Sequence, residues 1–190
     1  MNPILRSSAL LAAIASAATA GVINVIQLGS PDFIRFEVKC GAVSQPFELA
    51  HGGSTGRFVL PETEAAVLSL PNRETKSLSI PATKEPSIAV LTVEGDKDVW
   101  KLIPGKPTDD KWSLRAINIS SEAAVFESAG KPLEIAAGAT VQIPVAEKDD
   151  IAIQPKGGEM RAYDGREPCA VVALLYRKEG AWQVLFVPDR

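Results

Sequence analysis

EPSIAVL at residues 85–91 and EPCAVVA at residues 167–173 are two closely similar stretches that lie 82 positions apart. Trp100 and Trp182 have the same spacing, and an apolar run that ends in a proline follows each tryptophan. Similarity at a fixed spacing is the sequence signature of repeated structural units. The pattern predicts that the chain contains two similar halves.

Two further matches recur in the same order along the chain. Residues 57–61 (RFVLP) resemble residues 140–144 (TVQIP) at a spacing of 83. Phe36 and Phe126 lie centrally in similar stretches, but 90 positions apart, so this match requires a change in length in between. The order of the matches favours a duplicated domain.

Both halves consist of short runs rich in Val, Ile, Leu and Phe that end at Gly, Pro, Asp or Asn, which is typical of strands. Residues 21–190 show no clear helical period. About seven strands in each half fit an all-β protein of two tandem small immunoglobulin-like β-sandwich domains. The expected strands are residues 23–28, 33–38, 56–60, 67–70, 77–80, 88–93 and 99–103, then 113–119, 124–127, 133–135, 140–143, 150–154, 169–176 and 182–187.

A polar segment separates the two halves. Residues 104–111 (PGKPTDDK) contain two prolines, a glycine and four charges, and no large apolar side chain. Such a composition is typical of a linker. We therefore expect a first domain at residues 21–104, a linker at residues 105–112 and a second domain at residues 113–190.

The first twenty residues have the pattern of a secretory signal peptide. Arg6 precedes an uncharged apolar run, residues 8–17 (SALLAAIASA), and a small-x-small site follows at residues 18–20. We expect cleavage after Ala20 and a secreted or periplasmic protein. No other stretch approaches the length of a membrane-spanning helix, so no membrane span is expected.

The composition excludes several classes of function. Lys and Arg total 20, Asp and Glu total 23, and the net charge is −3, which gives no basic surface for nucleic acid. One histidine and two cysteines cannot build a His-rich metal site or a four-cysteine zinc site. We expect no bound metal and no cofactor.

His51 opens the most enzyme-like string, residues 51–56 (HGGSTG). His-Gly-Gly occurs in oxyanion loops of some α/β-hydrolases, but the chain has neither their G-x-S-x-G elbow nor their alternating helices. We interpret the string as a glycine-rich connection between two strands. Residues 136–139 (AAGA) occupy the corresponding place in the second half, so the histidine is not part of the repeat. No catalytic residue is predicted.

The aromatic residues divide into core and candidate binding residues. Trp100 and Trp182 each share a strand face with apolar residues, which favours a core position. Trp112 follows the linker, where it could fill an interface between the halves or stack on a ligand. Tyr163 and Tyr176 are the other aromatic residues that carbohydrate binding could use.

Two features of the expected strand at residues 169–176 leave alternatives open. Cys169 could form a disulfide with Cys40, which would join the halves, or it could simply be buried. The strand has no polar break, whereas a solvated outer sheet face would alternate. We expect its outer face to be covered by the first domain or by a second chain.

Residues 114–120 (LRAINIS), followed by Phe126 and Gly130-Lys131, resemble secreted bacterial immunoglobulin-like domains of unknown function. The resemblance implies a β-sandwich and carries over no catalytic residue. The sequence thus predicts a non-enzymatic secreted or cell-envelope protein with an interaction or structural role. Its partner would be another protein or an envelope component, and the sequence leaves the oligomeric state open. A carbohydrate-binding protein is the alternative, and a hydrolase centred on His51 is a third reading.

Overall fold

The structure is a computed structural model that describes residues 21–190 apart from twelve short stretches, two of them single residues. The expected signal peptide and most of the expected linker lie outside the described residues. Every element of the described chain is a β-strand. No helix in this part of the chain is long and apolar enough to cross a membrane. The residues left out after residue 20 are 31, 61–63, 72, 74–76, 83–84, 95–96, 106–111, 129–130, 146–150, 157–158, 164–168 and 189–190.

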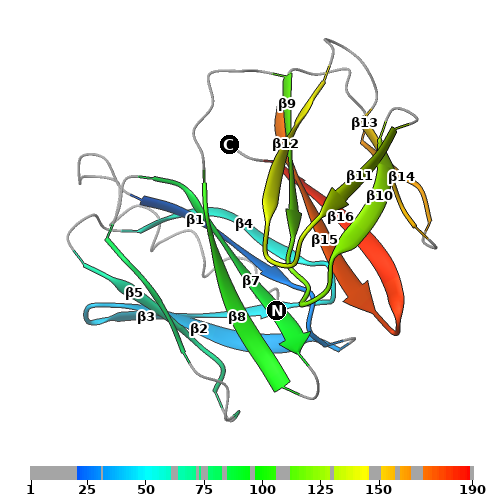
Figure 1. The fold of residues 1–190 in the computed structure, drawn as a ribbon. Helices are drawn as coiled ribbons and strands as arrows, with labels where there is room; N and C mark the ends of the chain where they lie inside the picture. Colours follow the sequence, from blue (N-terminus) through cyan, green and yellow to red (C-terminus); the bar gives the residue numbers. More distant parts are fainter. Residues whose placement is uncertain are drawn as a thin grey trace, which may run out of the picture. The chain divides into compact units, whose positions relative to one another are not determined.

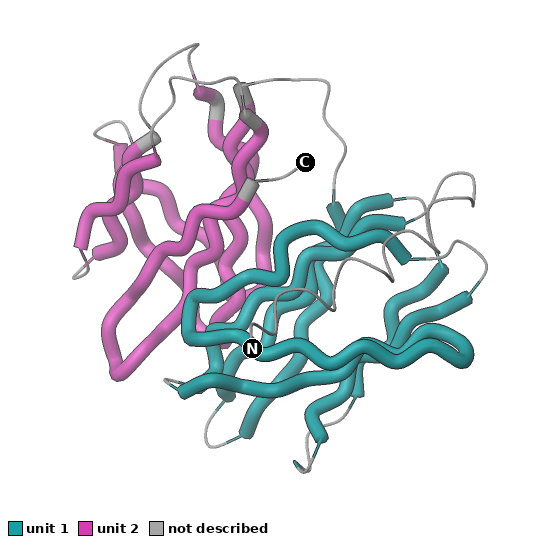
Figure 2. The backbone as a smooth tube through the Cα atoms, turned by 180° about the vertical axis from the view of Figure 1, so that it is seen from behind, with its two compact units in different colours: residues 1–105 teal, residues 106–190 magenta. Residues whose placement is uncertain are grey.

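The chain divides into two compact units, residues 1–105 and residues 106–190 (Figure 2). The division falls within the expected linker. Each unit contains two four-stranded sheets (Figure 1). The all-β architecture of two tandem sandwich-like units is therefore as the sequence predicts.

The first unit consists of the sheets β4-β1-β7-β8 and β3-β2-β5-β6. Strand β1 is central, because it pairs antiparallel with β4 and parallel with β7. The ladder between β1 and β4 contains a bulge at Asn24 to Ile26. The strands are β1 (Gly21–Gln27), β2 (Ile34–Cys40), β3 (Val43–Leu49), β4 (Ser54–Leu60), β5 (Ala66–Ser69), β6 (Leu78–Ile80), β7 (Ser87–Glu94) and β8 (Lys97–Pro104).

The second unit repeats this arrangement strand by strand. Its sheets are β12-β9-β15-β16 and β11-β10-β13-β14, and β9 again pairs antiparallel with one neighbour and parallel with the other. The shared topology supports the predicted duplication. The strands are β9 (Trp112–Asn118), β10 (Ala124–Ser128), β11 (Lys131–Ile135), β12 (Thr140–Pro144), β13 (Ile151–Pro155), β14 (Arg161–Tyr163), β15 (Cys169–Lys178) and β16 (Ala181–Pro188).

Each unit has its own hydrophobic core between its two sheets. In β2, Ile34, Phe36 and Val38 face the first core, and exposed or half-buried residues lie between them. Side chains two positions apart lie on the same face of a strand, so the alternation follows from the strand geometry. In the second unit, Phe126 is 2% exposed and occupies the place that Phe36 has in the first.

Two strands were missing from the prediction. Strand β3 contains Ser44, Gln45 and Pro46, which are weak strand formers, and its burial is low throughout. Strand β14 has three residues, too few for a visible alternation. Each unit consequently has eight strands rather than about seven.

The register of the repeat differs from the sequence match by two residues. The Leu28 N–H donates to the Leu91 carbonyl (2.7 Å), and the Ile119 N–H donates to the Leu175 carbonyl (3.0 Å). Leu91 therefore corresponds to Leu175, at a spacing of 84 instead of 82. Because side chains alternate with a period of two, a shift by two residues leaves every side chain on the same face. The two tryptophans are consequently not equivalent positions.

The hairpin of β2 and β3 accounts for the spacing of 90 between the two phenylalanines. Glu37 pairs with Pro46, and Glu127 pairs with Pro132. The first hairpin then continues for more residue pairs than the second before it turns. The match of Phe36 with Phe126 is therefore correct, and the extra length lies at the hairpin tip.

Strand β15 is buried on both faces. Val171, Ala173 and Leu175 belong to the second core. Ala170, Val172, Leu174 and Tyr176 point the other way, and each is at most 8% exposed. This burial agrees with the expectation that the outer face is covered, and the identity of the covering segment stays a prediction.

Candidate functional site

Two connections of the first unit meet where β1 ends. The Gly52 N–H donates to the Gln27 carbonyl (2.7 Å), and the Gln27 N–H donates to the Gly53 carbonyl (3.1 Å). Gly52 has a φ of 72°, a left-handed conformation that suits glycine. We call residues 27–33 and 50–53 the loop end of the first unit.

Gln27 holds the loop between β1 and β2. Its side chain is buried, at 1% exposure. Nε2 donates to the Ser30 carbonyl (2.8 Å) and to the Asp32 carbonyl (3.1 Å). These two bonds use both amide hydrogens and fix the orientation of the amide. Its Oε1 is buried and has no hydrogen-bond partner among the described residues.

His51 braces the same loop from the other connection. Its side chain is half-buried, and Nδ1 lies 3.2 Å from the Ser30 carbonyl oxygen. A carbonyl oxygen only accepts, so Nδ1 carries the proton in this contact. The Ser30 carbonyl thus receives hydrogen bonds from Gln27 and His51. The histidine fixes backbone geometry at this position.

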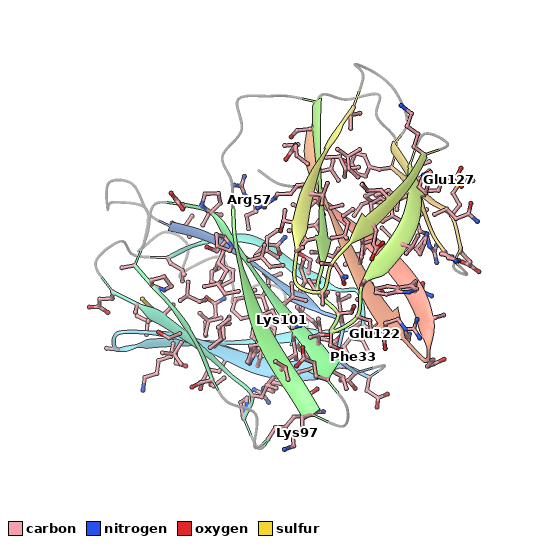
Figure 3. All side chains as sticks on the ribbon, in the orientation of Figure 1. Phe33, Arg57, Lys97, Lys101, Glu122 and Glu127 are labelled. Atoms are coloured by element: carbon pink, nitrogen blue, oxygen red, sulfur yellow. The ribbon has the colours of Figure 1, made fainter. Side chains whose placement is uncertain are left out.

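Phe33 follows the braced segment and is 68% exposed (Figure 3). The expected strand at residues 33–38 includes Phe33, and the sequence predicts no binding role for it. The structure instead begins β2 at Ile34, so Phe33 belongs to the loop. The preceding Pro31-Asp32 is a turn signal that could have indicated this.

The equivalent loop end of the second unit is closed by a different amide. Asn118 occupies the position of Gln27, since its N–H donates to the Ala139 carbonyl as that of Gln27 does to Gly53. Its Oδ1 accepts from the N–H (3.0 Å) and the hydroxyl (2.9 Å) of Ser120. Its Nδ2 donates to the carbonyls of Glu122 (2.7 Å), Ile135 (3.0 Å) and Ala136 (3.2 Å). Both the oxygen and the nitrogen of this buried amide therefore have hydrogen-bond partners.

Alanines stand in the second unit where the first has its distinctive side chains. The turn hydrogen bond from Gly53 to Ala50 (2.9 Å) recurs from Ala139 to Ala136 (3.1 Å), which aligns His51 with Ala137. The prediction that residues 136–139 correspond to the His51 string is thus confirmed. Of the two loop ends, only that of the first unit therefore has a histidine at this position.

The hairpin of β7 and β8 reaches the same loop end. A Cβ atom placed on Gly29 would lie 3.2 Å from Oδ1 of Asp98. Oδ2 of Asp98 forms an ion pair with Nη1 of Arg73. The described residues contain no group of three or more metal-ligating side chains.

The other candidate aromatic residues are not gathered into one site. Tyr163 is half-buried and packs on Phe186, with 5.8 Å between ring centroids. Tyr176 is 8% exposed, and burial raises its pKa while the charge of Arg161 opposes the shift. Tyr176 therefore offers no exposed ring for a sugar. The side chain of Trp112 lies outside the described residues.

The candidate disulfide is not formed by Cys40, which is a free cysteine in the structure. Its thiol donates to the Glu64 carbonyl (3.9 Å). Burial, and secondly the Glu64 carboxylate, raise the pKa of the thiol. The side chain of Cys169 lies outside the described residues, so pairing in an oxidising compartment stays a prediction. Cys40 and His51 lie at opposite ends of the β2–β3 hairpin.

Both tryptophans of the hairpin strands are core residues, as predicted. Trp100 packs against the first core and lies edge-on to Phe36, with 6.0 Å between ring centroids. Trp182 is 7% exposed in the second core, and the guanidinium of Arg177 lies 5.3 Å from its ring centroid. Neither ring is presented as a binding platform.

Comparison of the chain with protein-family models and with curated proteins finds no match.

Proposed function

We propose that this is a non-enzymatic secreted or cell-envelope protein that acts by binding another protein or an envelope component. The observation that carries the proposal is the exposed ring of Phe33 on a loop fixed by Gln27 and His51. Aromatic anchors contribute much of the energy of many interfaces. A loop that is already ordered loses little conformational entropy when it binds.

The compartment is proposed from the sequence of residues 1–20 and from the repeat architecture. A positive charge, an apolar run and a small-x-small site are the parts of an export signal. Small sandwich units are widely used as extracellular interaction domains, which is an argument by analogy of fold.

The hydrolase reading has less support from the geometry of His51. In a catalytic triad a carboxylate orients the histidine through Nδ1. Here Nδ1 faces the backbone carbonyl of Ser30 (3.2 Å). We therefore assign His51 a positioning role for the loop.

Carbohydrate binding is the second candidate function. Sugars stack on exposed aromatic rings, and Phe33 offers one. Tyr176, another candidate for sugar binding from the sequence, is buried. A glycan array probed with the protein and with Phe33→Ala distinguishes this function, because loss of a glycan signal in the variant would favour it.

The experiment for the interaction proposal is site-specific photocrosslinking in the native cell. A photoreactive phenylalanine analogue replaces Phe33, and a matched variant carries it at Val43, which is 48% exposed at the other end of the β2–β3 hairpin. We expect a discrete protein adduct from position 33 alone. Equal labelling from both positions, or none from position 33, would contradict the proposal.

A further inference from the structure

Strand β16 (Ala181–Pro188) is an edge strand without the usual protection against pairing. It is the last strand of the sheet β12-β9-β15-β16, and its recorded partner in the described chain is β15 (Figure 1). Its sequence AWQVLFVP carries no charge and has no proline before the last position. An edge strand that is long, apolar and uncharged is a template for another strand.

The other edge strands of both units are shorter, interrupted or charged. Strands β3 and β11 contain Pro46 and Pro132, and proline cannot donate to a ladder. Strand β4 has a bulge in its ladder and carries Arg57. Strands β6 and β14 have three residues each, and β12 has five and ends at Pro144.

Strand β8, the counterpart of β16 in the first unit, carries the charges that β16 lacks. Strand β8 has the same length of eight residues but contains Lys97, Asp98 and Lys101. The register spacing of 84 aligns Lys101 with Leu185. Lys101 forms an ion pair with Glu94 across the hairpin (2.6 Å). Lysine on an edge strand opposes pairing, because a neighbouring strand would desolvate its charge.

We propose that β16 pairs antiparallel with β16 of a second copy of this chain. The pairing joins the two four-stranded sheets edge to edge about a twofold axis. A second β16 is the best complement among the edge strands of the two units, since the other edges carry proline, a bulge, charge or too few residues. An uncharged strand also brings no like charges together when it pairs with itself. The pairing uses one edge of each copy and closes at two copies.

The surface that one strand pair buries is small, so the dimer should be weak and depend on concentration. This inference is independent of the loop end and of Phe33. It would stand if the proposed binding function failed.

The test is sedimentation velocity of the full protein as purified, from low to high micromolar concentration. We expect the wild-type protein to shift from monomer toward twice the monomer mass. Leu185→Lys, which introduces the lysine of the first unit at the half-buried equivalent position, should remain a monomer throughout. Gln183→Lys, also at a half-buried position, replaces Leu185→Lys in the test if that variant does not fold. Circular dichroism shows whether each variant is folded.

A reciprocal variant sharpens the test. Lys101→Leu removes the charge from the interior of β8 and should leave a second edge able to pair. We expect this variant to form assemblies larger than dimers. A wild-type protein that stays monomeric at high micromolar concentration would overturn the proposal. So would dimers of unchanged strength in both folded lysine variants.

Discussion

Gln27 and Asn118 show how one methylene group changes a loop after duplication. Both are buried amides at the same place after a central strand. The shorter Asn118 has hydrogen-bond partners at nitrogen and oxygen, whereas Gln27 leaves Oε1 without a partner among the described residues. An unpaired buried acceptor costs about 1–3 kcal/mol. The first loop end therefore has a less complete hydrogen-bond network.

Replacing His51 by alanine should weaken that network. The variant loses the hydrogen bond from Nδ1 to the Ser30 carbonyl, which is worth about 0.5–1.5 kcal/mol. We expect the free energy of unfolding to fall by about 1 kcal/mol in urea titration. Ala137→Gly at the equivalent position tests the backbone contribution alone. Amide hydrogen exchange should speed up at Ser30, Asp32 and Phe33 in the His51 variant; unchanged exchange there would contradict the role of the His51 hydrogen bond in holding this loop.

Burial of Tyr176 predicts a loss of stability in alkali. Its pKa in the folded protein is raised, so the neutral hydroxyl is favoured there. The unfolded chain releases this proton first, at about pH 10. The contribution to stability is thus complete below that pH and is lost as pH rises through the folded pKa. Thermal unfolding of wild type and Tyr176→Phe should diverge only above about pH 10. Parallel profiles would contradict the assignment.

At the scale of the strands, alternation predicted most elements but not their alignment. The runs that became β2, β7 and β15 are visible in sequence because their faces are apolar. The shift from 82 to 84 is invisible in sequence, since a strand looks the same on each face after two residues. Long-range hydrogen bonds such as that from Leu28 to Leu91 set the register.

The same dependence on long-range pairing explains why the geometry of the first loop end could not be predicted from the sequence. His51 stood out in the sequence, but its partner Ser30 lies on another connection, and only the pairing of β1 with β4 brings the two together. Phe33 was missed because a strand was assumed to begin one residue early. The sequence thus indicated His51 as a candidate residue but not the hydrogen bond that it forms with Ser30.

The two glycine turns that close the loop ends provide a matched pair of variants. Gly52 and Gly138 have φ angles of 72° and 70°, and nothing lies within 4 Å of a Cβ added at either. Alanine meets no clash there and is disfavoured by the left-handed backbone alone, by roughly 1–2 kcal/mol. We expect similar losses of stability from Gly52→Ala and Gly138→Ala in urea titration. Asparagine at each position should restore part of the loss; equal stability of alanine and glycine would contradict the reasoning.

For the whole molecule, the repeated topology explains how two small units can share one plan and differ in role. Each unit repeats the same strand order, while histidine, exposed phenylalanine and edge lysine occur in the first at positions where the second has other residues. Duplication supplies two scaffolds, so substitutions at a loop end or an edge leave the shared core intact. The proposed roles accordingly lie on different units, with binding at the first and self-pairing at the second.

The order of synthesis and export gives the last prediction. Gly21 opens β1 and is buried, paired with Leu60, and β1 is completed by β7 much later in the chain. If residues 1–20 are an export signal, cleavage after Ala20 must precede incorporation of β1, because a peptidase needs an accessible extended segment. Mass spectrometry of the exported protein should therefore find Gly21 as the first residue.

Replacing Ala20 by leucine should prevent this processing. The small-x-small pattern is what the signal peptidase accepts, and a large side chain there blocks it. We expect the variant to accumulate as uncleaved precursor in the membrane fraction, while Ala20→Ser is processed and released as the wild type is. An exported wild-type protein that retains residues 1–20 would contradict the signal, and the first strand would then begin inside a longer chain.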